Sequence, residues 1–213
     1  MGMMAALLAT VMNAEASLYP IGSIPDGSPV GVSFTGTYDG AASDATVGSL
    51  TVSLNISGGY NGNLYGYLVA PNGTMVMLLN QPGVTGSNPF GYAGSGLNVT
   101  LTDATTIGGN PVTGIQTTAE TPGQLFSGTY NAAGTLGTFN NSSANGEWTL
   151  FFADMTAGGG QSQLTGWSLG ITAVPEPVNV AMAIFGVSFI GVGAVRGYRN
   201  SRKATHPSSS LAA

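Results

Sequence analysis

Hydrophobic and polar residues alternate along several short segments in the middle of the chain. Residues 50–56 read LTVSLNI, and the same period of two recurs at 97–101, 148–152 and 167–171. This is the pattern of a β-strand that buries one of its two faces. Turn sequences separate the segments, among them Gly58-Gly59, Asn61-Gly62, Pro71-Asn72-Gly73 and Asn145-Gly146. Short alternating strands between glycine-rich turns predict an all-β fold, a β-sandwich or a jelly roll.

Both ends of the chain carry an apolar segment of a different kind. Residues 3–12 are apolar and are followed by Ala14-Glu15-Ala16, a small-x-small site, which predicts a signal peptide over residues 1–16. Residues 178–195 form an uncharged apolar run that predicts one C-terminal transmembrane helix; a buried helix of a soluble protein is the alternative. Four cations follow the run and mark its cytoplasmic side: Arg196, Arg199, Arg202 and Lys203.

The charges between these two ends exclude several functions. Residues 17–174 hold seven carboxylates and no Lys, Arg, His or Cys, so their formal charge is 0 − 7 = −7. Nucleic acid is therefore excluded as a partner, because phosphate binding depends on Lys and Arg. Nucleophilic catalysis with a histidine base is excluded as well, because His206 lies in the tail at 204–213.

Any metal in this region has to be a hard cation held by oxygen atoms, with calcium as the first choice. Asp103 and Asp154 each follow a predicted strand and are the candidate calcium ligands, together with nearby backbone carbonyls. The alternative is that both carboxylates cap turns.

Aromatic and acidic residues supply the remaining candidates. Trp148 and Trp167 have apolar neighbours two positions away, which favours core packing over a sugar-stacking platform. Glu120 and Glu147 are a candidate carboxylate pair of a glycosidase, although the alternation directs Glu147 to the solvent face. Four tyrosines near turns are better candidates for a stacking platform: Tyr60, Tyr65, Tyr67 and Tyr92.

Two segments resemble a known protein family. Residues 62–78 read GNLYGYLVAPNGTMVML, and residues 145–171 contain NGEWTL, then Asp154, then LTGWSLGI; Asp103-Ala104 also matches a family pair. They resemble the P domain (P/Homo B domain) that follows the catalytic domain in subtilisin-like proprotein convertases. The resemblance covers residues 24–172 and implies a jelly-roll β-sandwich that packs on, stabilises or recognises another molecule. It implies no peptidase activity, because the chain has no room for a protease domain, and Asn63 replaces an aspartate that is common in the family.

The C-terminal part has a resemblance of its own. Val174-Pro175-Glu176-Pro177 precedes the apolar run and the four cations, and this order is similar to the PEP-CTERM sorting signal of Gram-negative bacteria. The resemblance assigns residues 175–203 to the signal and implies an exosortase that cuts near residues 175–177. The protein is then held in the inner membrane before processing and reaches the cell surface or extracellular matrix afterwards.

We therefore expect an exported, non-catalytic module at residues 17–174 that contacts exopolysaccharide or another surface protein in a biofilm matrix. Its processing partners are signal peptidase and exosortase, and calcium is its one candidate cofactor. The first alternative is an accessory domain for a separate subtilisin-like serine protease. The second is a carboxylate-dependent glycan hydrolase.

Overall fold

The computed structural model describes residues 19–174. Three predicted segments lie outside the described residues: the signal peptide (1–16), the sorting signal (175–203) with its transmembrane helix and cations, and the tail (204–213). Among the residues that are described, no helix is long and apolar enough to span a membrane.

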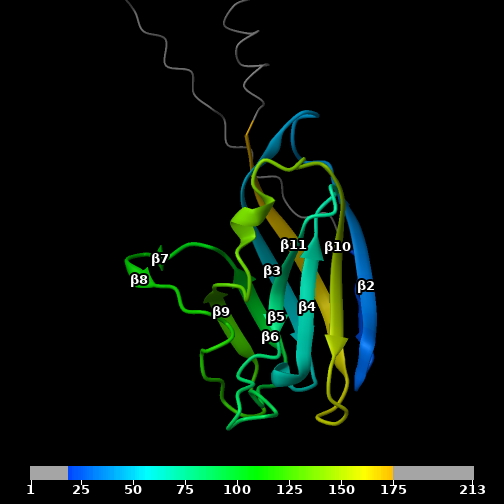
Figure 1. The fold of residues 1–213 in the computed structure, drawn as a ribbon, viewed down its shortest axis with the longest axis vertical. Helices are drawn as coiled ribbons and strands as arrows, with labels where there is room; N and C mark the ends of the chain where they lie inside the picture. The colour runs from blue at the N-terminus through cyan, green and yellow to red at the C-terminus, as the bar shows by residue number, and fades with distance from the viewer. Residues whose placement is uncertain (1–18, 175–213) are drawn as a thin grey trace, which may run out of the picture. The chain divides into compact units, whose positions relative to one another are not determined.

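Residues 19–174 fold into two main β-sheets that face each other as a sandwich, with one small hairpin beside them (Figure 1). This confirms the predicted all-β class. The five-stranded sheet has the order β1-β11-β3-β6-β9, and the four-stranded sheet has the order β2-β10-β4-β5. The strands of the five-stranded sheet are β1 Gly22–Ile24, β11 Ser162–Val174, β3 Thr46–Ser57, β6 Leu97–Leu101 and β9 Phe126–Tyr130. Those of the four-stranded sheet are β2 Ser28–Tyr38, β10 Gly146–Asp154, β4 Leu64–Val69 and β5 Met75–Asn80.

Long loops and short helical turns complete the domain. The 3-10 helix η1 (Asn61–Asn63) leads into β4, and η2 (Leu136–Phe139) precedes β10. The small hairpin pairs β7 (Thr106–Ile107) with β8 (Asn110–Pro111). Neighbouring strands are antiparallel in both main sheets except β6 and β9, which run parallel.

The predicted strands lie where the alternation put them. Residues 50–56 lie in β3, 97–101 form β6, 148–152 lie in β10 and 167–171 lie in β11. Their inner side chains, such as Leu54 and Phe152, are fully buried and belong to one core.

Both tryptophans lie in this core, as predicted. Trp148 is fully buried and donates a hydrogen bond from Nε1 to the carbonyl of Ala144 (3.2 Å). Trp167 stacks on Tyr19 with ring centroids 4.3 Å apart, and its Nε1 donates to the carbonyl of Pro20 (3.0 Å). Neither ring presents a face to solvent, so a sugar-stacking role for the tryptophans is not supported.

Replacing Trp148 by alanine removes the largest of the fully buried side chains. We expect Trp148→Ala to lower the free energy of unfolding by about 3–5 kcal/mol, because a large cavity replaces the ring. Phe90→Ala is the control, since Phe90 is 69% exposed, and it should change stability by about 0.5 kcal/mol or less. Urea unfolding measures both values, and equal losses would contradict the packing described here.

Candidate functional site

Most of the chemically reactive residue types are missing from the described part of the chain. Residues 19–174 contain no Lys, Arg, His or Cys. Within the same residues, no three or more Asp, Glu, His or Cys side chains lie close enough together to hold a metal ion.

Asp103 and Asp154 occupy different parts of the domain. Asp103 lies beside residues 49–51 of β3, whereas Asp154 pairs with Leu64, near the Ser57 end of β3. About six strand residues, roughly 20 Å, separate the two positions. Calcium ligands lie about 2.3–2.6 Å from the ion, so the two carboxylates cannot share one ion.

Each of these carboxylates accepts backbone N–H groups, which is the alternative that the sequence left open. Asp103 accepts from the N–H of Leu136 (2.9 Å) and of Gly137 (2.6 Å). Asp154 accepts from the N–H of Thr156 (3.3 Å). Asp154 is fully buried, and this burial, with Asp26 nearby, raises its pKa above the ordinary range, although hydrogen bonds from Thr156 and Gly27 oppose the shift.

The candidate glycosidase carboxylates are also far apart. Glu147 is exposed and pairs with Thr37 at the start of β10, beyond the Val69 end of β4. Glu120 accepts a hydrogen bond from Asn61 Nδ2 (2.7 Å), beyond the Leu64 end. The six residues of β4 lie between them and span roughly 20 Å, whereas glycosidase carboxylates are about 5–9.5 Å apart. The structure does not assemble this pair.

The outer surface of the four-stranded sheet carries a cluster of apolar side chains. Along β4, Leu64, Gly66 and Leu68 point into the core, so the residues between them point outward. Residues on β5 and β10 that are paired with these outward residues lie on the same surface. The pairs are Tyr67 with Met77, Tyr67 with Phe151, and Val69 with Met75. We call this surface the apolar face; it comprises Tyr65, Tyr67, Val69, Met75, Met77 and Phe151.

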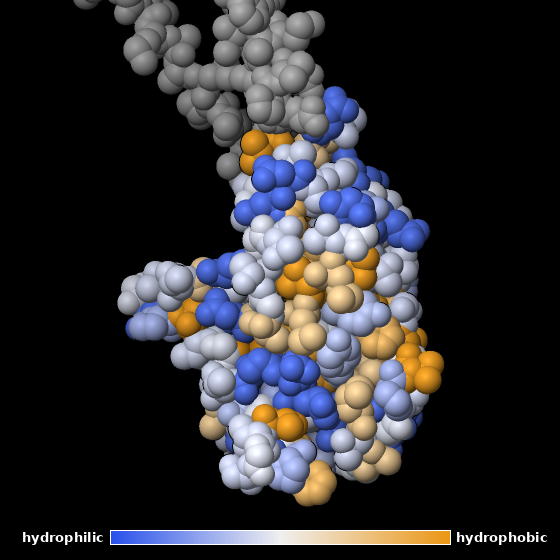
Figure 2. Space-filling view, viewed as in Figure 1, coloured by the Kyte–Doolittle hydropathy of each residue, from blue (hydrophilic) through white to orange (hydrophobic). Residues whose placement is uncertain are grey.

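Ring contacts fix the geometry of the apolar face. Tyr67 and Phe151 stack with centroids 4.6 Å apart and planes 14° apart. Tyr65 meets Tyr67 edge-on, at 6.2 Å and 75°. Met75 is 56% exposed, and the other five side chains are half-buried. Figure 2, which views the molecule from the side of this sheet, shows apolar surface over its middle between hydrophilic areas.

The surroundings of the apolar face are polar or acidic. Thr35 on β2 and Thr149 on β10 share a hydrogen bond between their hydroxyls (3.0 Å). Glu147 is two positions before Thr149 and therefore projects from the same side of the sheet. The outward side of this sheet therefore combines an apolar centre with polar and acidic neighbours.

The structure brings together two of the four predicted platform tyrosines. Tyr65 and Tyr67 lie side by side on the apolar face. Tyr60 and Tyr92 lie on loops, where the ring of Tyr92 packs against Gly83. The sequence reasoning missed Phe151, Met75 and Met77. The period of two that placed Trp148, Leu150 and Phe152 in the core also places Phe151 on the opposite face, so the signal for Phe151 was present.

Comparisons with known proteins give a partial likeness. No family model matches the chain, and no curated protein matches it. A solved structure of a serine protease of Aeromonas sobria is similar, with 18% identity, a TM-score of 0.39, and coverage of 76% of this chain and 26% of that chain. The same protease in complex with its chaperone gives 17% identity, a TM-score of 0.41, and coverage of 78% and 26%. The chain thus spans about a quarter of the length of these proteins, and scores this low assign no function to it.

Glu120 is a half-buried carboxylate whose protonation bears on stability. Burial raises its pKa above the ordinary value of 4.5, and hydrogen bonds from Asn61 and Gly94 oppose the shift only in part. One carboxylate oxygen, Oε1, is buried without a hydrogen-bond partner.

We expect stability to fall as the pH rises from 4.5 through the raised pKa of Glu120, because the unfolded chain releases this proton at a lower pH than the folded domain does. Glu120→Gln, which carries no charge at any pH, should be more stable than the wild type above this range and should flatten the decline. Urea unfolding of the wild type and of Glu120→Gln between pH 4 and 8 measures this pH dependence of stability. Glu147→Gln, at an exposed strand position, is the matched control, and an identical effect from both variants would contradict the assignment to Glu120.

Proposed function

We propose that residues 19–174 are a non-catalytic accessory domain that binds a protein partner through the apolar face. The observation that carries the proposal is the contrast between the two outer surfaces of the sandwich. One outer surface displays stacked aromatic rings and methionines. The other displays cross-strand rows of small polar residues: Ser168, Ser53, Thr100 and Thr129 in one row, and Gly166, Asn55, Asn98 and Ser127 in the next. The first offers grouped apolar side chains, with Met75 56% exposed, whose area association would remove from water.

A separately encoded serine protease is the partner class that we propose. Support comes from the segments that resemble the P domain, residues 62–78 and 145–171. They form the β4–β5 hairpin and the consecutive strands β10 and β11, which lie in different sheets. Three of these four strands carry the apolar face. On this proposal the domain is a jelly roll of the P-domain type that stabilises its protease or directs its substrates.

Charge narrows the chemistry of the partner further. Residues 19–174 contain seven carboxylates and no Lys or Arg, so a partner that forms ion pairs with this domain must supply every cation. We infer a docking surface with an apolar centre and Lys or Arg at its edge, opposite Glu147.

A cation placed in the apolar face tests the proposal. We expect Met75→Lys to weaken the complex with a co-purifying protease by about tenfold or more, because burying an unpaired ammonium group is costly. Asn55→Lys adds the same charge to the exposed polar surface of the other sheet and is the matched control. The readout is the stoichiometry and affinity of the protease recovered from the producing cell. Equal recovery with both variants, or no protease at all, would overturn the proposal.

A second candidate function is contact with exopolysaccharide in the extracellular matrix. It is supported by the rows of hydroxyl and amide side chains on the five-stranded sheet, where Ser53 and Thr100 share a hydrogen bond of 3.3 Å. Retention of the protein on the polysaccharide of its own organism, without a protease at defined stoichiometry, favours this candidate over the first.

We also propose that the domain is exported and sorted through its C-terminal segment by an exosortase. Support comes from the order of Val174-Pro175-Glu176-Pro177, the apolar run 178–195 and the four cations. β11 ends at Val174, which is 47% exposed, so a cut within residues 175–177 removes no strand of the sandwich.

Mass spectrometry of the mature surface protein tests the sorting proposal. We expect a C-terminus within residues 174–177, because the segment beyond is the part that an exosortase removes. A mature protein that still carries residues 199–213 would mean that processing at this motif does not occur.

A further inference from the structure

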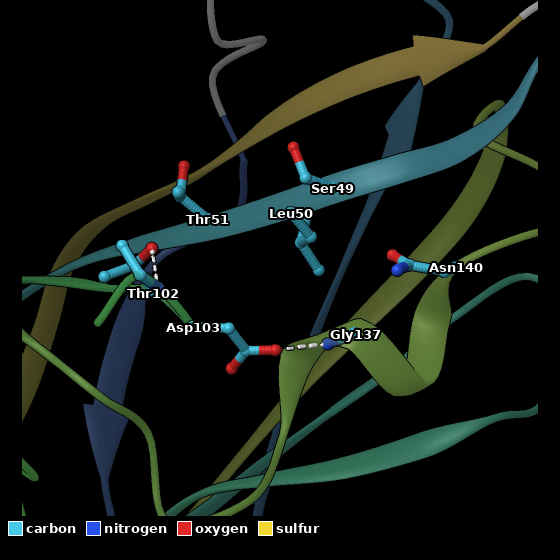
Figure 3. Close-up of a pocket in the computed structure, with 8 residues that line it drawn as sticks. Ser49, Leu50, Thr51, Thr102, Asp103, Gly137 and Asn140 are labelled. Carbon is cyan, nitrogen blue, oxygen red and sulfur yellow. Dashed lines mark hydrogen bonds between the residues drawn. The ribbon is translucent and has the colours of Figure 1, made fainter. Parts of the chain in front are cut away.

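A cavity of about 340 Å³ opens beside β3, on the side where β6 leaves that strand. Pairing between β3 and β6 ends at Val52 and Leu101, and the next backbone bonds on that side join Val47 to residues 141 and 142. Gly137 of η2 and the adjacent Asn140 form the wall of the cavity that faces β3. Figure 3 shows Leu50 pointing from β3 toward the space between Asp103 and Asn140, while Ser49 and Thr51 point to the other side of the strand.

Two polar side chains converge at the same point of this cavity. A methyl group placed on Gly137 would lie 3.3 Å from Asp103 Oδ2 and 3.6 Å from Asn140 Nδ2. The hydrogen bonds from Leu136 and Gly137 hold the carboxylate of Asp103 in place, so it is oriented before any ligand arrives. Asn140 is exposed, and its side chain makes no hydrogen bond within residues 19–174.

The lining combines these polar groups with an apolar floor. Leu50 is 4% exposed, and Ala104 also lines the space. A carboxylate accepts hydroxyl hydrogens, and a primary amide both donates and accepts. The volume is at the lower end of the roughly 300–1,000 Å³ of small-molecule sites. A small molecule with several hydroxyls and an apolar C–H surface matches this set of groups.

Charge decides between ligand classes. An anionic ligand would approach the charge of Asp103 with no Lys, Arg or His anywhere in residues 19–174 to offset it. A calcium ion needs about six to eight oxygen ligands, whereas this cavity offers one carboxylate whose two oxygens already accept N–H groups. An uncharged polyol avoids both difficulties.

We propose that this cavity binds one residue of a neutral sugar, with Asp103 accepting from its hydroxyls and Asn140 completing the polar contacts. The site shares no residue with the apolar face. The sugar-binding proposal therefore depends on neither the protease partner nor the sorting signal. The domain can bind a protein on the four-stranded sheet and a sugar beside β3 of the five-stranded sheet.

The test uses the full chain in a mild detergent and ligand-observed saturation-transfer NMR. The probes are glucose, galactose and mannose at millimolar concentration, with glucuronate as the negatively charged counterpart of glucose. We expect a signal from at least one neutral sugar and none from glucuronate. Absence of any signal from all three neutral sugars overturns the proposal, as does an equal signal from glucuronate and glucose.

Two variants tie the signal to the cavity. Gly137→Ala places a methyl group between Asp103 and Asn140, and Asn140→Ala removes the amide; each should weaken binding by about tenfold or more. Gly86→Ala, at a glycine whose added Cβ meets nothing within 4 Å, and Asn110→Ala, at an exposed position on β8, are the matched controls. Urea unfolding checks that Gly137→Ala is folded, and Asn140→Ala leaves both hydrogen bonds of Asp103 intact. Binding that survives both cavity variants overturns the proposal.

Discussion

Burial of the two inner sheet faces against each other is the constraint on which the other features depend. The chain has no cysteine, and residues 19–174 supply no Lys, Arg or His to pair with their carboxylates, so stability has to come from apolar packing and backbone hydrogen bonds. The same packing sets the outer surfaces. Once Leu64 and Leu68 are fixed inward, Tyr65 and Tyr67 have to face outward, and a slip of one residue would exchange the two sets.

The sequence predicted strands from their alternation, but it did not show which strands pair. Residues 50–56 were recognised because four apolar residues recur at a period of two, and residues 167–171 because three do, starting with Trp167. β2 was not recognised, although Val30, Val32, Phe34 and Tyr38 follow the same period of two with only Gly36 between them. Its place at the edge of the four-stranded sheet comes from pairing with β10, more than 100 residues later in the chain.

The candidate sites were even less accessible from sequence. The cavity forms because Asp103 reaches Gly137, 34 residues away, and because β6 separates from β3 after Leu101. No local pattern encodes either event. Asp103 was identified as a candidate, and the turn-capping role that the sequence left open is the one it has. The part-buried hydrogen bond between Asn61 and Glu120, 59 residues apart, depends in the same way on how η1 meets a distant loop.

The stacking of Tyr19 on Trp167 has a consequence for the order in which the domain folds as the chain is synthesised. Trp167 Nε1 bonds the carbonyl of Pro20 across 147 residues, and β1, the first strand, pairs with β11, the last. Synthesis begins at the amino end, so Tyr19 emerges from the ribosome early and Trp167 only near the end of the domain. The edge of the five-stranded sheet therefore closes only when almost the whole domain has emerged, and until then the inner faces of the strands remain open to chaperones and to proteolysis.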